Sequence, residues 1–294
     1  MKIATFAGGD DVGGVGYRTA TAFNRLKPDW EYRAYCLHPS YLRYPTHTPW
    51  TRRSLDDWNA ADVHHTHDYI PELGIRRPTV VTFHGTGFRE SPDELLAYAG
   101  DARILVSTLD LWLAKPADTT WSPQIEDTAA LAAMRVPHDG PLRICHAPTN
   151  RSLKSTAEFL AACDELPVEV VLIEGKSWAE SLTIKATCDI LFDQTAYGYG
   201  GNSTEAWAMG IPTICGAPDV VMSEYQSRFG YIPFVECTAT TIRAAIERLL
   251  EPAEREHFSR VGREHAERFH SQEAAIERLA PIYESVAQEG TCMS

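Results

Sequence analysis

The stretch from Cys188 to Cys215 places the strongest constraint on how this chain can fold. It begins as a short apolar strand, passes through a loop with three glycines in four positions (Gly198, Gly200 and Gly201), and continues as a helix. Glycine lets a loop backbone approach a ligand closely, and a helix N-terminus presents unpaired N–H groups to an anion. The stretch therefore predicts an anion site, most often a phosphate site.

Glu205 lies in the first turn of the expected helix, where a carboxylate would repel a phosphate. One interpretation is that it accepts hydrogen bonds from hydroxyls beside the phosphate, such as those of a ribose. The other is an ordinary loop followed by an acidic residue that interacts favourably with the helix dipole. The residues of this stretch alone leave both interpretations open.

Strands alternate with helices along the whole chain, which predicts parallel sheets covered by helices on both faces. A second cycle of this alternation opens with the strand at 142–146, after a poorly patterned zone at 129–141. We therefore expect an α/β fold of two Rossmann-like domains, at 1–137 and 138–272, followed by a helical C-terminal segment at 273–294.

Composition limits the classes of partner. The net charge is −13 with 27 Lys and Arg residues, so no chain-wide field attracts nucleic acid or an anionic membrane, although a local basic patch could. The seven cysteines include no Cys-x-x-Cys pair and are typical of reduced core thiols. Neither a signal peptide nor an apolar run long enough for a transmembrane segment is visible, so we expect a cytoplasmic protein.

The first strand leads into a loop that contains Gly13, Gly14 and Gly16. This loop matches the dinucleotide fingerprint only loosely, because no third spaced glycine follows and the second strand does not end in an acidic residue. NAD is therefore disfavoured, and the loop is either an anion site or a tight turn. Asp11 in the loop and Arg18 in the helix after it are candidates for the acceptor side of a substrate site.

Four histidines belong to or follow two expected strands. His64, His65 and His67 share one strand, on which His65 and His67 face one side and His64 faces the other. Because no Cys or carboxylate at zinc spacing accompanies them, we expect a cluster that lines a cleft and no metal site. His84 follows the next strand, at the end where α/β sheets bind ligands; a buried structural histidine is the alternative.

Arg151 and Lys154 precede a helix in the second half, just beyond a strand end. Basic residues at this position oppose the helix dipole, so a bound anion would explain them. We expect a diphosphate between these two cations and the amides of Ser203 and Thr204. The alternative is a pair of solvated surface cations.

Residues 38–54 form an expected irregular loop that is basic and aromatic in an otherwise acidic chain. Arg43, Arg52 and Arg53 are interspersed there with aromatic residues. Such a mixture can hold phosphates and stack on bases or sugar rings, which indicates a phosphate-bearing acceptor or a hydroxylated base that is flipped out of a nucleic acid. The alternative is a surface loop whose aromatics pack beneath it.

Taken in order, these motifs resemble those of the GT-B glycosyltransferases, specifically the glycogen-synthase-like family 4. The resemblance spans most of the chain up to residue 270 and is carried by residues 13–16, 62–67, 80–86, 146–154 and 203–212. It implies two Rossmann-like domains that face each other across a cleft, with a nucleotide diphospho-sugar bound mostly by the C-terminal domain. It also implies that the last helix crosses back to the N-terminal domain. No cofactor is implied, since the nucleotide-sugar is a co-substrate.

The resemblance further implies roles for individual residues. Arg151 and Lys154 match the basic pair that binds the donor diphosphate, and Glu205 matches the glutamate that holds the ribose hydroxyls. His84 matches the cleft histidine that contacts the transferred sugar, so it joins the two cations as a catalytic candidate. The remaining members of the donor-binding set are Gly13, Gly14, Gly200, Gly201, Ser203 and Thr204.

Two departures from the family pattern affect the site. The family often carries two glutamates separated by seven residues, and the first would fall at Tyr197. The carboxylate on the sugar side is therefore absent or comes from elsewhere. The second half also lacks one strand–helix unit, which places the nucleobase pocket around Glu174–Lys176.

The main hypothesis is a metal-independent glycosyltransferase that moves a sugar from a nucleotide diphospho-sugar, such as a UDP-sugar, to an acceptor hydroxyl with retention. A sugar-nucleotide epimerase of the same architecture is one alternative. A non-catalytic nucleotide-sugar binder is a second, because Tyr197 stands at the usual acid position. A transferase that acts on a hydroxylated nucleic-acid base is a third.

Overall fold

The computed structural model describes residues 1–291 except 10, 12, 46, 47, 73, 75 and 76, without the side chains of 290 and 291. Cys292 and part of the 38–54 segment therefore lie outside the described residues. The chain divides into two compact units: unit 1 comprises 1–125 and the segment from Gln272 onward, and unit 2 comprises 126–271. No helix in the described ranges is long and apolar enough to cross a lipid bilayer.

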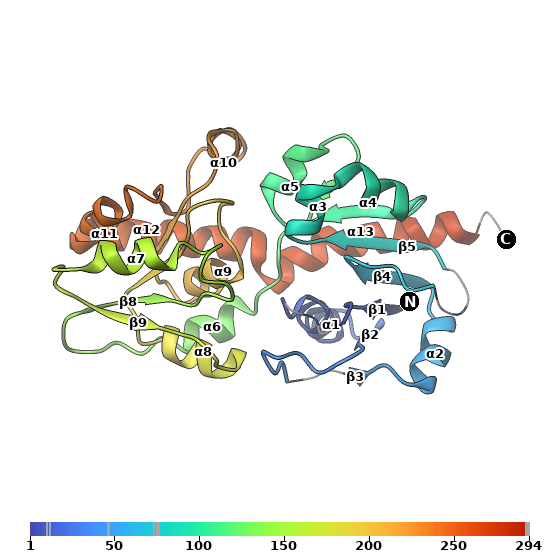
Figure 1. Ribbon diagram of the computed structural model, residues 1–294. Helices are drawn as coiled ribbons and strands as arrows, with labels where there is room; N and C mark the ends of the chain where they lie inside the picture. The colour runs from blue at the N-terminus through green and yellow to red at the C-terminus, as the bar shows by residue number, and fades with distance from the viewer. Residues whose placement is uncertain (10, 12, 46–47, 73, 75–76, 292–294) are drawn as a thin grey trace. The chain divides into compact units, whose positions relative to one another are not determined.

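Unit 1 is a parallel sheet of seven strands in the order β3-β2-β1-β4-β5-β6-β7 (Figure 1). Its strands are β1 (Lys2–Phe6), β2 (Glu31–Cys36), β3 (Thr48–Pro49), β4 (Val63–His67), β5 (Thr79–Phe83), β6 (Arg103–Val106) and β7 (Thr120–Trp121). Its helices are α1 (Val15–Leu26), α2 (Arg52–Asn59), α3 (Thr86–Glu90), α4 (Pro92–Ala99), α5 (Leu109–Ala114) and α13 (Gln272–Thr291).

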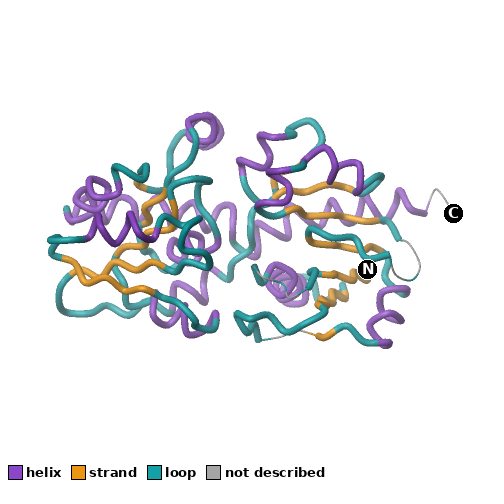
Figure 2. Tube along the Cα trace, in the orientation of Figure 1, coloured by secondary structure: helices purple, strands orange, loops and turns teal. Residues whose placement is uncertain are grey.

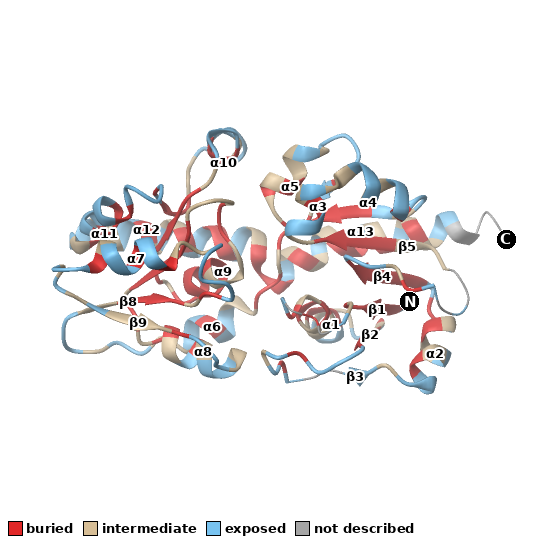
Figure 3. Ribbon diagram, viewed as in Figure 1, coloured by how far each residue is buried: buried red, intermediate tan, exposed pale blue. Residues whose placement is uncertain are grey.

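The two faces of this sheet carry separate apolar cores because successive strand residues point to opposite sides. Ile3, Val63 and Val80 belong to the core under α1 and α13, whereas the next residues Ala4 and Val81 belong to cores on the other face. Figure 3 shows the inner strands β1, β4 and β5 as mostly buried and the outward helix surfaces as exposed. Burial on both faces explains why the inner strands β5 and β6 are largely apolar rather than alternating.

Unit 2 is a parallel sheet of five strands in the order β12-β11-β10-β8-β9, again with helices around it (Figure 2). Its strands are β8 (Leu142–His146), β9 (Val168–Leu172), β10 (Ile190–Gln194), β11 (Thr213–Cys215) and β12 (Val235–Glu236). Its helices are α6 (Thr128–Ala133), α7 (Thr156–Cys163), α8 (Trp178–Lys185), α9 (Gly201–Ala208), α10 (Asp219–Phe229), α11 (Ile242–Leu250), α12 (Pro252–His265) and the π-helix η1 (Ala266–His270).

The strand order reverses once in each sheet. In unit 1 the reversal lies between β1 and β4, and in unit 2 it lies between β8 and β10. Connections leave the sheet in opposite directions at such a point, so a crevice opens at the carboxyl ends of the two strands, where α/β proteins bind ligands. The expected α/β fold with two Rossmann-like halves is confirmed, and it specifies where in each half a ligand would bind.

The division between the units falls at residue 125, twelve residues before the boundary that the sequence suggested. The segment between the two positions includes α6, which packs against α9 and η1 of unit 2. At the other end of the chain, α13 packs against α1, β4 and β5 of unit 1. Tyr283 of α13 lies in the buried aromatic cluster of Phe23, Trp30 and Tyr32, which anchors the helix there.

Candidate functional site

A buried polar cluster of unit 2 lies at the β8–β10 reversal and is centred on Asp193. This residue occupies a register shift in β10, between Phe192 and Gln194, and such bulges turn a side chain away from its regular direction. Its buried carboxylate accepts hydrogen bonds from Lys154 Nζ (2.6 Å), the Gly200 amide (2.8 Å) and Ser203 Oγ (2.8 Å). Asp193 is not among the residues predicted from the sequence, although a charged residue at the end of an apolar strand was a usable signal.

Asp193 is an internal anion. Burial alone would raise its pKa, but Lys154 and the hydrogen-bond donors outweigh burial and hold the pKa below its usual value. The ionised carboxylate in turn fixes the Lys154 ammonium, whose side chain stays 19% exposed. An ammonium has three donors, so the two that Asp193 leaves can face a ligand.

The loop that carries Arg151 and Lys154 is shaped by Asn150. The Oδ1 atom of Asn150 accepts hydrogen bonds from the Ser152 amide (3.1 Å), the Ser152 hydroxyl (2.8 Å) and the Leu153 amide (3.3 Å). Such local bonds between an Asn side chain and the backbone two and three residues on are typical of a tight turn. The turn places both basic residues at the carboxyl end of β8.

Helix α9 begins at Gly201 with Gly200 as its N-cap, so Glu205 lies beyond the first turn in which the sequence analysis placed it. The expected donors at 203 and 204 are therefore already used, because both amides bond to the Gly200 carbonyl (3.0 and 3.2 Å). The amides of Gly201 and Asn202 have no acceptor among the described residues. The helix N-terminus can thus still bind an anion, but through these two amides.

Arg151 makes a two-pronged ion pair with Glu174, the second residue after β9. Its Nε and Nη2 atoms lie 2.7 and 2.5 Å from the two carboxylate oxygens. The hydrogen bond from Arg151 lowers the pKa of Glu174, so this carboxylate is ionised. The guanidinium is 58% exposed, and an ion pair that is open to water contributes little to stability, so a ligand can displace it.

Glu205 does not lie at the helix N-terminus, because α9 starts earlier than expected. Its carboxylate accepts hydrogen bonds from Trp178 Nε1 (2.8 Å) and Lys185 Nζ (2.5 Å), both from α8. Only 4% of the Glu205 side chain and 2% of the Lys185 side chain are exposed. The two oxygens that the resemblance assigns to a ribose are therefore both engaged inside unit 2.

We expect Glu205→Gln to lower the free energy of unfolding by about 3–5 kcal/mol, because it leaves the Lys185 ammonium buried without its counter-charge. Adding Lys185→Met should recover more than half of that loss, since no buried charge remains. Urea denaturation measures both changes, with Glu247→Gln in the exposed Arg243 pair as the control. If the free energy of unfolding of Glu205→Gln alone is within 0.5 kcal/mol of the wild-type value, a structural role for the pair is contradicted.

The histidines of unit 1 form a buried row beside the β1–β4 reversal. His65 and His67 share one face, with ring centroids 4.4 Å apart, whereas His64 stacks on Trp58 on the other face, as the strand period predicts. His67 Nδ1 lies 3.0 Å from His84 Nε2, and the His84 amide donates to Asp68 (2.6 Å). His84 is half-buried at the carboxyl end of β5, so it is positioned by its neighbours and still accessible.

The surroundings of these histidines favour the neutral form of their imidazole rings. His65 Nδ1 lies 2.8 Å from the hydroxyls of both Tyr32 and Tyr283, and its Nε2 lies 2.8 Å from Thr82 Oγ1. Burial lowers the pKa of His65 to about 3 and that of His64 to about 4. Within the described part of the chain, no group of three metal-ligating side chains is close enough to hold an ion.

These pKa values predict that stability falls on acidification. An unfolded histidine binds a proton below pH 6.5, whereas His64 and His65 stay neutral in the folded state until about pH 4 and pH 3. Each should therefore remove about 2 kcal/mol of unfolding free energy between pH 7.5 and pH 5. His65→Gln should shrink that pH-dependent loss by about 2 kcal/mol in urea titrations; an unchanged pH dependence would contradict this.

In the glycine loop of unit 1, an acidic side chain of the loop itself binds the amides at the start of the following helix. The buried Asp11 carboxylate accepts hydrogen bonds from the amides of Gly16 (3.2 Å) and Tyr17 (3.1 Å), and so occupies the N-terminus of α1. Gly14 has φ +62°, and a side chain there would collide with the Tyr44 ring at 2.4 Å. Gly13, one residue earlier, is exposed.

Arg18 is buried rather than presented to solvent. Its guanidinium lies 3.5 Å from the Ile125 carbonyl and 5.8 Å from the centre of the Tyr44 ring. Its contacts therefore support the turn and the end of unit 1. With Asp11 at the start of α1, the two acceptor-side candidates of this region are part of the local packing.

The 38–54 segment is not wholly irregular, which corrects the sequence prediction. Arg52 and Arg53 form the first turn of α2, which Thr51 and Ser54 cap reciprocally. Trp50 packs against Phe6, with ring centroids 5.4 Å apart. Tyr44 is also buried, so the alternative in which aromatics pack beneath the segment is confirmed for these two residues. Arg43, Arg52 and Arg53 stay exposed.

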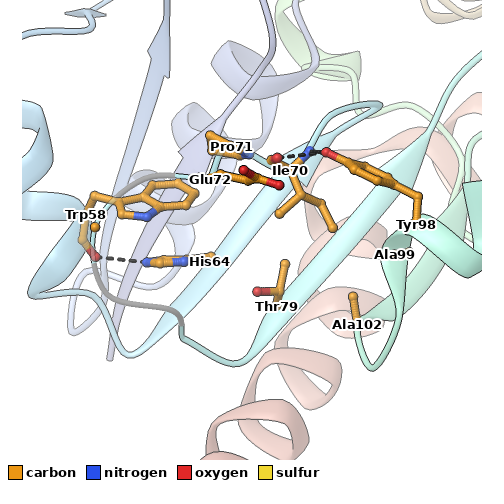
Figure 4. A pocket seen from close by; sticks show the side chains of 10 residues that line it. Trp58, His64, Ile70, Pro71, Glu72, Thr79, Tyr98, Ala99 and Ala102 are labelled. Carbon is orange, nitrogen blue, oxygen red and sulfur yellow. Dashed lines mark hydrogen bonds between the residues drawn. The ribbon is translucent and has the colours of Figure 1, made fainter.

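A pocket of about 390 Å³ lies in unit 1 beside α2 and α4 (Figure 4). Trp58 and His64 form one wall, and the Tyr98 hydroxyl, bonded to the backbone of Ile70, forms another. Thr79, which also lines it, is the first residue of β5, so the pocket lies near the amino ends of the strands. It is away from the edge that carries the glycine loop and His84, and we assign no substrate to it.

No family model and no curated protein matches this sequence. Solved structures match its fold over nearly the whole chain. An alpha-glucosyltransferase in complex with UDP and a 13-mer DNA containing a HMU base has a TM-score of 0.67 at 9% identity, over 97% of this chain and 99% of that one. HepE from Anabaena, in complex with UDP-glucose, has a TM-score of 0.67 at 10% identity, over 97% and 100%.

Sucrose-phosphate synthase from Thermosynechococcus elongatus has a TM-score of 0.66 at 13% identity, over 97% of this chain and 99% of that one. At such identities the likeness shows the fold alone. The structural neighbours are GT-B glycosyltransferases, and the two Rossmann-like units of this chain have the same fold.

Proposed function

We propose that this chain is a glycosyltransferase that moves a sugar from a nucleotide diphospho-sugar, most simply a UDP-sugar, to an acceptor hydroxyl. The observation that carries the proposal is the fixed Lys154 ammonium beside the open amides of Gly201 and Asn202, at the reversal of the unit 2 sheet. An ammonium and a helix N-terminus are both typical phosphate binders. The shared fold with transferases that were solved with UDP and UDP-glucose supports the donor class.

In this mechanism the residues of unit 2 stabilise the leaving group. The bond between the sugar and the diphosphate breaks, and negative charge grows on the phosphate oxygens. Lys154, Arg151 and the two amides face that charge, and fixed donors of this kind are most effective when they need no rearrangement. These protein groups would supply the charge that a metal ion supplies elsewhere, so we propose a metal-independent reaction, with retention as in the family that the motifs resemble.

The two cations differ in how they reach the diphosphate. The Lys154–Asp193 pair is buried on the Asp193 side, so Lys154 keeps this partner and uses its remaining donors. The Arg151–Glu174 pair is exposed, so Arg151 can leave Glu174 at little cost. Lys154 with Asp193 and Arg151 with Glu174 each form a pair without net charge. The site therefore has no uncompensated charge before the donor binds.

On the acceptor side, unit 1 places the half-buried His84 at the carboxyl end of β5, and we propose that it contacts the transferred sugar. Arg52 and Arg53 remain candidates for a phosphate-bearing acceptor because both are exposed. A nucleic-acid base is the weaker candidate, since Tyr44 and Trp50 are packed and the net charge is −13. The described cysteines are buried thiols, which supports a reducing compartment such as the cytoplasm.

The test is a screen of nucleotide-sugars and acceptors by mass spectrometry. Transfer to an acceptor, or slow hydrolysis of the donor to UDP, supports the proposal. Conversion of a UDP-sugar into its epimer without an acceptor would instead identify the epimerase. Donor binding by calorimetry, with neither transfer nor hydrolysis, would identify a non-catalytic binder.

We expect Lys154→Ala and Arg151→Ala each to reduce turnover by about 10²–10³-fold, because each removes a donor to the charge that develops in the transition state. Arg151→Ala should melt within a few degrees of the wild type. Lys154→Ala should melt lower, because it leaves the buried Asp193 carboxylate without its counter-charge, so turnover is measured at a temperature at which each variant is folded. Arg260→Ala, which removes an exposed partner of Glu264, is the matched control and should keep full turnover. EDTA should have no effect; inhibition by EDTA that Mn²⁺ reverses would contradict the metal-independent mechanism.

A further inference from the structure

We propose that Glu174, rather than Glu205, is the carboxylate that accepts hydrogen bonds from the ribose hydroxyls of the donor. Arg151 holds this carboxylate until the donor arrives. The inference rests on the proposed function, because it concerns how the same site recognises its nucleotide. Glu174 would thereby determine specificity for the ribose, although the sequence places it in the stretch expected to form the nucleobase pocket.

The position of Glu174 in the sheet is the first argument. β8 is the first strand of unit 2, and β9 is the second and pairs with it in parallel. The Ile173 amide bonds to the His146 carbonyl (2.8 Å), so the ladder continues past β9 and places Glu174 at its very end. In nucleotide-binding α/β units, an acidic residue near the end of the second strand accepts hydrogen bonds from ribose hydroxyls while the phosphates lie beside the first strand.

Access is the second argument. The side chain of Glu174 is 34% exposed, whereas that of Glu205 is 4% exposed and has both oxygens occupied by Trp178 and Lys185. The next residue, Gly175, has φ +63° and open space where a side chain would stand. A ribose can therefore approach Glu174 from solvent, while reaching Glu205 would require breaking a buried ion pair.

The exchange of partners is the third argument. Arg151 belongs to the same loop as Lys154 and binds Glu174 through two hydrogen bonds. When Arg151 turns to the diphosphate, the ionised Glu174 loses its donors and needs new ones. Two vicinal ribose hydroxyls supply two donors at a matching spacing. Phosphate binding and ribose binding are thereby coupled, which favours a complete nucleotide over either fragment.

The experiment compares the affinity for UDP with that for 2′,3′-dideoxy-UDP by calorimetry in four proteins. These are the wild type, Glu174→Gln, Glu205→Gln, and Glu169→Gln as the matched control. Glu169 lies on the same strand β9 in another exposed ion pair, with Arg143. The ratio of the two dissociation constants isolates the hydroxyl contacts, because any effect on phosphate binding changes both affinities equally.

We expect the wild type and Glu169→Gln to bind UDP at least tenfold more tightly than the dideoxy analogue, as hydrogen bonds to a charged carboxylate require. Glu174→Gln should reduce this ratio to about threefold or less. If Glu174→Gln still prefers UDP over the dideoxy analogue as strongly as the wild type, the inference is overturned and the proposed function stays intact. The same holds if Glu205→Gln is folded and is the only variant that loses this preference. A folded wild type that binds no UDP would overturn the inference together with the UDP donor.

Discussion

The buried ion pair between Asp193 and Lys154 is the interaction on which the rest of unit 2 depends. Asp193 stands at the bulge where β10 leaves its regular register, and its carboxylate joins the β8 loop, the glycine loop and the start of α9. An internal carboxylate therefore lies beside the helix N-terminus, next to the Gly201 and Asn202 amides that remain open to a ligand anion. Its negative charge would repel the phosphates of a ligand. The same carboxylate, however, holds the Lys154 ammonium and the start of α9, with its two open amides, in position.

Three ion pairs in this unit differ in burial, and burial separates their roles. Lys185 and Glu205 are both enclosed, so the pair joins α8 to α9 and is unsuited to exchange with a ligand. Lys154 and Asp193 are enclosed on one side only, so the cation is fixed but reachable. Arg151 and Glu174 are open to water, so both can change partners when a nucleotide binds.

The sequence was sufficient for the fold and for the clustering of Lys154 with the glycine loop at the end of a strand, because apolar strands, glycine loops and basic residues at strand ends are local signals. The sequence was insufficient to predict which of these groups are free to bind a ligand. Glu205 and the amides of residues 203 and 204 looked available, but α9 begins at Gly201. Both amides therefore bond to the Gly200 carbonyl, and Glu205 lies beyond the first turn and is paired with Lys185. Pairings such as Asp193 with Lys154 join residues 39 positions apart, and no local pattern specifies them.

The most direct test of this account is the affinity of Asp193→Asn for UDP, measured by calorimetry beside the wild type. The variant has nearly the same shape and removes a negative charge from the neighbourhood of the phosphates. If Asp193 acts by holding Lys154, the affinity should fall at least tenfold, a loss of about 1.4 kcal/mol. If Asp193 only repels the ligand, the affinity should rise, and that result would contradict the central claim.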